Sequence, residues 1–106
     1  MSDAQVGAVF AALGDDTRRN IWRAVVDDGP VTATALAGRV PITRQAVSRH
    51  LRVLDEAGLV TADRVGRETR YVARPGSVRD AADWLAAADA AWRDRLARLK
   101  SRAESR

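Results

Sequence analysis

The chain has 106 residues, of which 46% are hydrophobic, and a net charge of +4. This length suits one domain with one modest core, and we expect residues 1–106 to form it. The absence of cysteine excludes a disulfide framework, no apolar run reaches the length of a membrane span, and the N-terminus lacks a secretion signal. We therefore expect a cytoplasmic protein that does not cross a membrane.

The first predicted helix spans about residues 3–13. Ser2 and Gln5 resemble a capping box. Apolar residues then recur at helical spacing: Val6, Val9, Phe10 and Leu13. Asp15 or Asp16 is expected to cap a second helix, on which Trp22 belongs to the core.

Residues 31–58 have the pattern of two helices joined by a tight turn. Thr32 is a candidate N-cap for a short helix over residues 33–39, with Leu36 and Val40 facing inward. Pro41 cannot continue that helix, and Thr43 is the expected N-cap of the next one. Gly58 occupies the position where a left-handed residue ends a helix. This arrangement is typical of a helix-turn-helix.

The second of these helices, within residues 43–57, has two faces of different chemistry. Val47, Leu51 and Leu54 lie on one face, with His50 beside them, and are expected to dock on a core. The other face is polar and basic and contains no acid: Thr43, Arg44, Gln45, Ser48, Arg49 and Arg52. Such side chains read base edges and hold phosphates when a helix enters a major groove. By itself, the pattern also fits an ordinary solvated helix face.

A β-hairpin is predicted next, with strands at residues 59–63 and 69–73 and Gly66 in the loop, where a positive φ is expected. Arg64, Arg67 and Arg70 cluster at or near its tip. A hairpin directly after a recognition helix is a wing, and its arginines are candidates for phosphate or minor-groove contacts. Across residues 41–74, seven arginines stand against four acids, so positive charge is concentrated in this half.

Three segments together resemble the ArsR/SmtB family of bacterial winged-helix repressors, over residues 6–73. They are LGDDTRR at residues 13–19, AVSRHL at residues 46–51 and AGLV at residues 57–60. The resemblance implies a homodimer that binds a double-stranded DNA operator and represses transcription. It implies a mainly α fold with a small β-hairpin, in the order α-α-α-α-β-β-α, dimerised through its first and last helices.

The last predicted helix, about residues 78–101, carries an apolar stripe that a small core cannot cover. Ser77 is the expected cap after the Pro75-Gly76 break. The stripe consists of Trp84, Leu85, Ala88, Trp92, Leu96 and Leu99. One alternative is that this helix folds back on its own first helix. We favour pairing with a second copy, because tryptophan is enriched at interface centres. Under this interpretation, Val6, Val9, Phe10 and Leu13 belong to the same interface.

Metal sensing and catalysis are not expected. The chain has no cysteine, and its one histidine, His50, is expected to be a hydrogen-bonded packing residue of the recognition helix. The last helix offers aspartates but no histidine. We therefore predict no metal site, no catalytic residue and no cofactor, and a protein that is not an enzyme.

Two hypotheses remain from the sequence. The first is a sequence-specific, homodimeric transcriptional repressor that does not respond to metals. The second is a winged-helix module for protein–protein contact without sequence-specific DNA binding. Within the first, an operon repressor without ligand, a sensor of an organic ligand and a sensor of a partner protein all remain open. The operator, the target genes and any inducer are not deducible from the chain.

Overall fold

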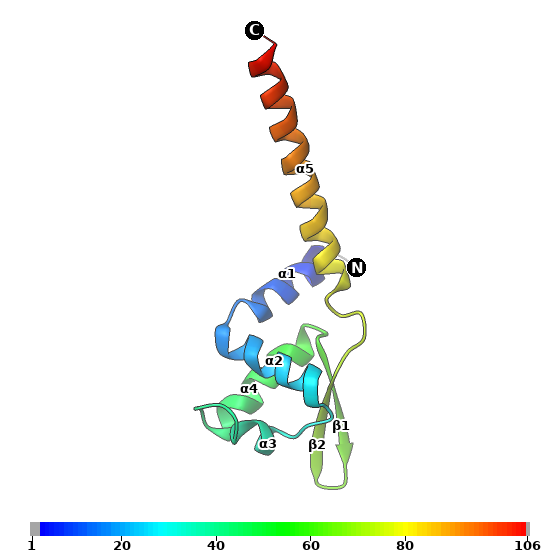
Figure 1. The fold of residues 1–106 in the computed structure, drawn as a ribbon. Coiled ribbons are helices and arrows are strands. Elements are labelled where there is room, and N and C mark those ends of the chain that lie inside the picture. The colour runs from blue at the N-terminus through cyan, green and yellow to red at the C-terminus, as the bar shows by residue number, and fades with distance from the viewer. Residues whose placement is uncertain (1–2, 106) are drawn as a thin grey trace.

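The computed structural model describes residues 3–105, which form five helices and one hairpin (Figure 1). In chain order these are α1 (Asp3–Leu13), α2 (Asp16–Asp28), α3 (Ala33–Ala37), α4 (Arg44–Glu56), β1 (Val60–Val65), β2 (Glu68–Ala73) and α5 (Arg79–Glu104). The predicted order and the mainly α class with a small hairpin are confirmed. Among these residues no helix combines the length and the hydropathy that a membrane crossing needs.

Three of the helices begin at the caps that the sequence predicts. The side chain of Asp15 accepts a hydrogen bond from the backbone N–H of Arg18, which starts α2. The hydroxyls of Thr32 and Thr43 accept from backbone N–H groups three residues on and start α3 and α4. Each cap satisfies a donor that the first turn of a helix leaves without an intrahelical partner.

Several predicted boundaries were wrong. Ser77 does not cap α5: its backbone N–H donates to the carbonyl of Arg74, the residue is buried, and Val78 occupies the N-cap position without a side-chain bond. Helix α3 ends at Ala37 rather than at residue 39, and β1 continues two residues further than predicted. The capping box predicted from Ser2 falls outside the described residues.

The core lies where α1, α2, α3 and α4 meet the start of the hairpin. Its fully buried large side chains are Val9, Ile21, Val25, Leu36, Val47, Leu51, Leu54, Leu59 and Val60. Trp22 packs against this core half-buried, as predicted, and its indole N–H donates to the carbonyl of Leu59 at 3.4 Å. The buried face of α4 is the predicted one, so its polar face is directed outward.

The hairpin is antiparallel and its register places Arg64 opposite Thr69 and Asp63 opposite Arg70. Gly58, which follows α4, and Gly66, in the turn, have φ of 79° and 63°. These are the two positions where the sequence predicts a left-handed residue, which glycine adopts without a steric penalty. A pair of backbone hydrogen bonds between Val31 and Tyr71 joins β2 to the segment between α2 and α3.

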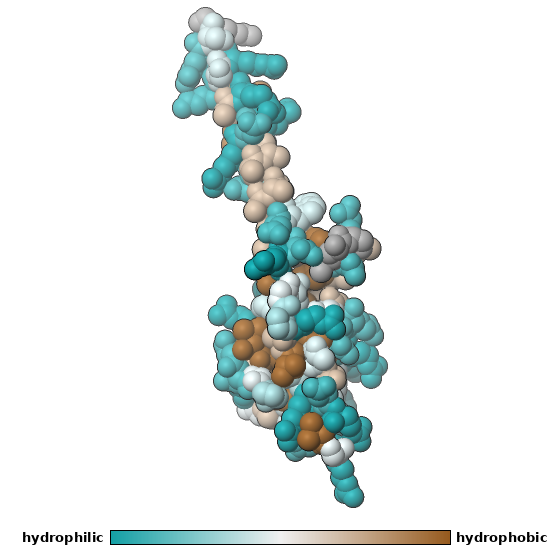
Figure 2. Space-filling view, turned by 90° about the vertical axis from the view of Figure 1, so that its right-hand side faces the viewer, coloured by the Kyte–Doolittle hydropathy of each residue, from teal (hydrophilic) through white to brown (hydrophobic). Residues whose placement is uncertain are grey.

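Helix α5 leaves the body of the molecule as an extended arm (Figure 1), and the chain measures 71 × 28 × 21 Å. Only its first turns contact the rest of the described chain: Ala81 is buried, and the rings of Trp84 and Phe10 meet edge to face at 5.6 Å. Every residue from 82 to 105 is exposed. In Figure 2 pale brown, weakly apolar atoms gather on the half of the arm nearer the body, and hydrophilic side chains dominate towards its end.

Candidate nucleic-acid interface

A groove of about 490 Å³ lies between α3, α4 and the hairpin. Four of the predicted DNA contacts line it together: Arg44 and Ser48 from α4, and Arg64 and Arg67 from the wing. Three guanidinium groups from two separate elements therefore converge on one concave surface. Guanidinium groups present several fixed N–H donors and match phosphate and guanine geometry, so the groove suits an anionic, hydrogen-bonding ligand.

The recognition helix presents its other predicted contacts outside the groove. Gln45, Arg49 and Arg52 are exposed on the polar face of α4, while Val47, Leu51 and Leu54 on the opposite face are buried. Thr43 is exposed but its hydroxyl is used as the cap of α4. The helix is thus held by its apolar face and has its N-terminal arginine and amide free to enter a groove of DNA.

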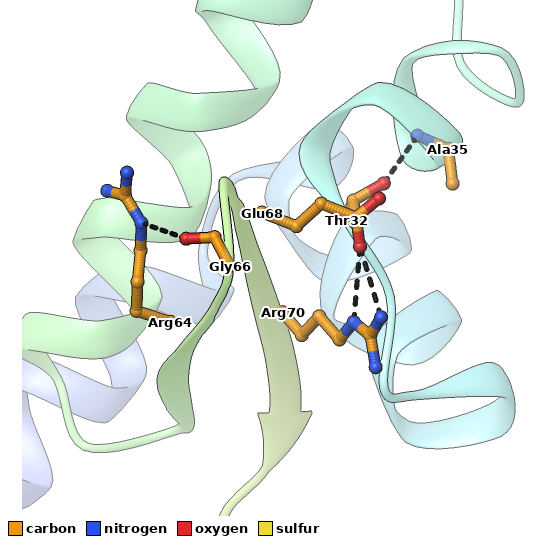
Figure 3. A network of polar contacts seen from close by, with 6 residues as sticks. All are labelled: Thr32, Ala35, Arg64, Gly66, Glu68 and Arg70. Atoms are coloured by element: carbon orange, nitrogen blue, oxygen red, sulfur yellow. Dashed lines mark hydrogen bonds and ion pairs between the residues drawn. The ribbon is translucent and has the colours of Figure 1, made fainter.

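The wing separates its arginines between two faces. Arg64 points to the side of α4, and its Nε donates to the carbonyl of Gly66 at 3.2 Å (Figure 3). Arg70 points to the other side, where it forms an ion pair with Glu68 at 3.2 Å. Arg70 does not line the groove, because the register puts it opposite Asp63 rather than beside Arg64.

Sequence reasoning missed six residues that complete the groove. They are Thr32, Ala33 and Thr34 of the α3 region and Glu68, Thr69 and Tyr71 of the wing. The two-residue period of a strand is the signal that could have found Thr69 and Tyr71, since both lie on the face of β2 that Arg64 meets. Glu68 adds an acidic residue to this lining, and its carboxylate is paired with Arg70 at 3.2 Å.

His50 lies beside the buried face of α4, half-buried, with its Nδ1 3.3 Å from a guanidinium nitrogen of Arg18. The expectation of a hydrogen-bonded packing residue is confirmed. Within residues 3–105 no group of three or more histidine, cysteine or acidic side chains is arranged to hold a metal ion.

The predicted interface residues fall into two groups. Val6 and Val9 are buried and Phe10 and Leu13 half-buried within the chain itself, so they already contribute to its core. The second group comprises the exposed residues of α5: Trp84, Leu85, Ala88, Trp92, Leu96 and Leu99. Any surface that α1 and α5 offer to another molecule is therefore provided chiefly by α5.

Comparison with known proteins assigns the family. A family model described as a helix-turn-helix domain matches residues 13–62. The chain is 44% identical to the uncharacterized HTH-type transcriptional regulator YuzN of Bacillus subtilis, over 57% of this chain and 72% of that protein. It is 40% identical to an ArsR-like transcriptional regulator from Rhodococcus sp. RHA1, whose structure superimposes with a TM-score of 0.81 over 92% of each chain. The chain belongs to the ArsR/SmtB family of winged helix-turn-helix transcriptional regulators.

Members of this family are DNA-binding transcriptional regulators, not enzymes. A further ArsR-type structure covers 84% of this chain at 27% identity and a TM-score of 0.67. It is described as the homodimeric winged helix-turn-helix DNA-binding domain Mb0332 from Mycobacterium bovis. This chain has the same arrangement of helices and wing as that Mycobacterium bovis domain.

Proposed function

We propose that this ArsR regulator is a homodimeric, cytoplasmic repressor that recognises a DNA operator with α4 and the wing. The observation that carries the proposal is the groove in which Arg44, Ser48, Arg64 and Arg67 converge. A duplex laid across it would meet donors from the helix and from the hairpin at once. In this arrangement Gln45 and Arg44, in the first turn of α4, read base edges, while Arg67 at the wing tip holds phosphate or a narrow minor groove.

Homodimerisation is the second part of the proposal. Residues 1–106 would form one winged helix-turn-helix domain, with the α1 and α5 helices acting in dimerisation. The exposed tryptophans and leucines of α5 support this, since large contiguous apolar surfaces on soluble proteins mark interaction sites. The Mycobacterium bovis neighbour is itself described as homodimeric. A dimer presents two recognition helices to two half-sites.

The third part is that regulation does not depend on thiophilic metals or zinc. The chain has no cysteine, and its only histidine already contacts Arg18. Zinc is bound by cysteine, histidine and carboxylate ligands, and structural and sensor sites need several of them close together. The proposal leaves the inducer unidentified.

The experiment compares a duplex selected by the wild type from a random-sequence library with a scrambled duplex of the same composition. Gln45→Ala should lower the ratio of the two affinities, because removing a side chain that reads a base costs about 1–3 kcal/mol. Arg67→Ala should weaken binding to both duplexes more evenly, and flatten the salt dependence by about one unit for each phosphate that Arg67 neutralises.

The reverse pattern, in which Gln45→Ala preserves the ratio while Arg67→Ala collapses it, would exchange the two roles. A wild type from which no preferred sequence can be selected at any salt concentration would overturn the proposal. The winged-helix module for protein contact would then take its place.

A further inference from the structure

Arg18, in the first turn of α2, joins three elements through one guanidinium group. Its Nε donates to the carbonyl of Ala12 at 2.6 Å and one terminal nitrogen donates to the carbonyl of Ala11 at 3.3 Å. The other terminal nitrogen lies 3.3 Å from Nδ1 of His50 on α4. The guanidinium therefore connects the C-terminal end of α1 with the recognition helix.

Each contact has a clear physical reason. Carbonyls in the last turn of a helix lack intrahelical partners, and a cation at that end also interacts favourably with the helix dipole. The carbonyl of Ala12, a buried residue, is in this position, and the carbonyl of Ala11 accepts from the backbone N–H of Gly14 at 3.3 Å as well as from Arg18. A guanidinium has only donors, so in this contact Nδ1 of His50 is the acceptor.

The contact between Arg18 and His50 also lies between two parts of the molecule with different proposed tasks. The α5 arm is proposed to dimerise, and α4 is proposed to recognise DNA. Phe10, one residue before Ala11, packs edge to face on Trp84 of the α5 arm. His50 lies on α4 directly after Arg49 of the exposed basic face. A continuous line of contacts thus runs from the arm, through α1 and Arg18, to the helix that meets DNA.

We propose that Arg18 is a positioning residue for DNA recognition, which through His50 holds the recognition helix α4 at a defined angle to α1. This inference rests on the proposed function. The planar fork is what the role requires, because its donors point in fixed directions toward three acceptors on two elements. A lysine ammonium would keep the charge and could not reproduce that geometry.

The chain provides a matched control in the neighbouring arginine. Arg19 donates to the carbonyl of Leu13 at 2.7 Å and pairs with Asp16 at 2.6 Å. It too binds a carbonyl at the end of α1, but neither of these bonds reaches α4. Arg19→Lys therefore removes an equivalent fork without affecting the recognition helix.

The test uses the full chain and the same selected and scrambled duplexes. Arg18→Lys and His50→Leu should each lower affinity for the selected duplex about fivefold, with scrambled-duplex affinity kept within about twofold. The double variant should be no weaker than Arg18→Lys alone, because both changes break the same hydrogen bond. Arg19→Lys should retain both affinities. Far-UV circular dichroism establishes that each variant is folded at the assay temperature.

Unchanged selectivity in folded Arg18→Lys, effects that multiply in the double variant, or an equal loss in Arg19→Lys would each overturn the inference. If His50→Leu fails to fold, His50→Asn takes its place. An asparagine carbonyl can accept near the position of Nδ1, so selectivity should then be retained, and its loss would count against the inference. A wild type that selects no sequence would instead refute the proposed function, so the two failures are distinguishable.

Discussion

Replacing Trp92 with alanine should weaken the proposed dimer more selectively than any other single change in α5. Trp92 is 56% exposed and lies on the part of α5 that contacts nothing else in the described chain, so the change leaves the subunit's own packing intact. Trp84, by contrast, also packs on Phe10. An aromatic side chain of this size presents about 150–250 Å². Burying the exposed part of Trp92 therefore removes roughly 85–140 Å² from water.

At about 25 cal/mol per Å², that burial is worth about 2–3.5 kcal/mol for each tryptophan. A symmetric dimer contains two copies, so the loss is at least about 4 kcal/mol and we expect the dimer Kd of Trp92→Ala to rise at least about 1,000-fold. Sedimentation equilibrium measures this directly, since the wild type should approach twice 11.5 kDa. Binding to the selected duplex should weaken in parallel, because a dimer engages two half-sites together.

The matched control is Arg98→Ala. Arg98 is a long exposed side chain outside the apolar stripe of α5, where it pairs with Asp94. Its removal should change the dimer Kd by about twofold or less, since exposed ion pairs contribute little. A wild type that remains at 11.5 kDa at micromolar concentration and still discriminates between duplexes would refute the reasoning. An equal effect of Trp92→Ala and Arg98→Ala would do the same.

Three further outcomes are expected. Stoichiometric Zn²⁺, Cd²⁺ or arsenite should leave affinity for the selected duplex within about twofold, and a tenfold loss in a DNA-binding titration would reveal an oxygen-rich metal site. The backbone N–H of Arg18 lowers the pKa of Asp15 below its ordinary value of 3.8, so this cap stabilises the fold at neutral pH and the gain is lost as pH falls through the lowered pKa. Thermal melts should accordingly show Asp15→Ala less stable than wild type at pH 7, with the two Tm values converging in acid. Glu68→Gln should strengthen binding to scrambled DNA and reduce the selected-to-scrambled ratio of affinities. The reason is that the change removes a carboxylate from the lining of the groove and releases Arg70 from its ion pair. Unaltered affinities in the same titration would show that Glu68 has no role in DNA binding.

The helices could be predicted because their signals are local. A cap depends on one side chain and a backbone N–H three residues on, so Asp15, Thr32 and Thr43 were identifiable from sequence alone. Ser77 has a hydroxyl that could cap a helix, but it does not cap α5. The turn before α5 directs it inward and Val78 follows as the cap, a choice made by packing of that turn rather than by the residue itself.

The candidate site was predictable helix by helix but not as an assembled surface. The period of α4 places Arg44 and Ser48 outward without reference to any other element. Which wing arginines join them depends on the hairpin register, and that register sends Arg64 toward α4 and Arg70 away. Thr34 lines the groove because of the way α3 packs on α4, and no local sequence pattern predicts that packing.

The exposed arm α5 links the proposed dimerisation to the folding of this helix. Residues 82–105 are exposed throughout, so the body of the chain stabilises little of α5 beyond Ala81 and Trp84. Isolated helices are marginal in water, and most helical stability in proteins comes from packing an apolar face. The stripe that includes Trp92 and Leu96 is such a face. A second copy that covers it would stabilise the helix and bring the two recognition helices together in one step. Operator recognition by two half-sites would then depend on subunit concentration through the folding of α5 itself.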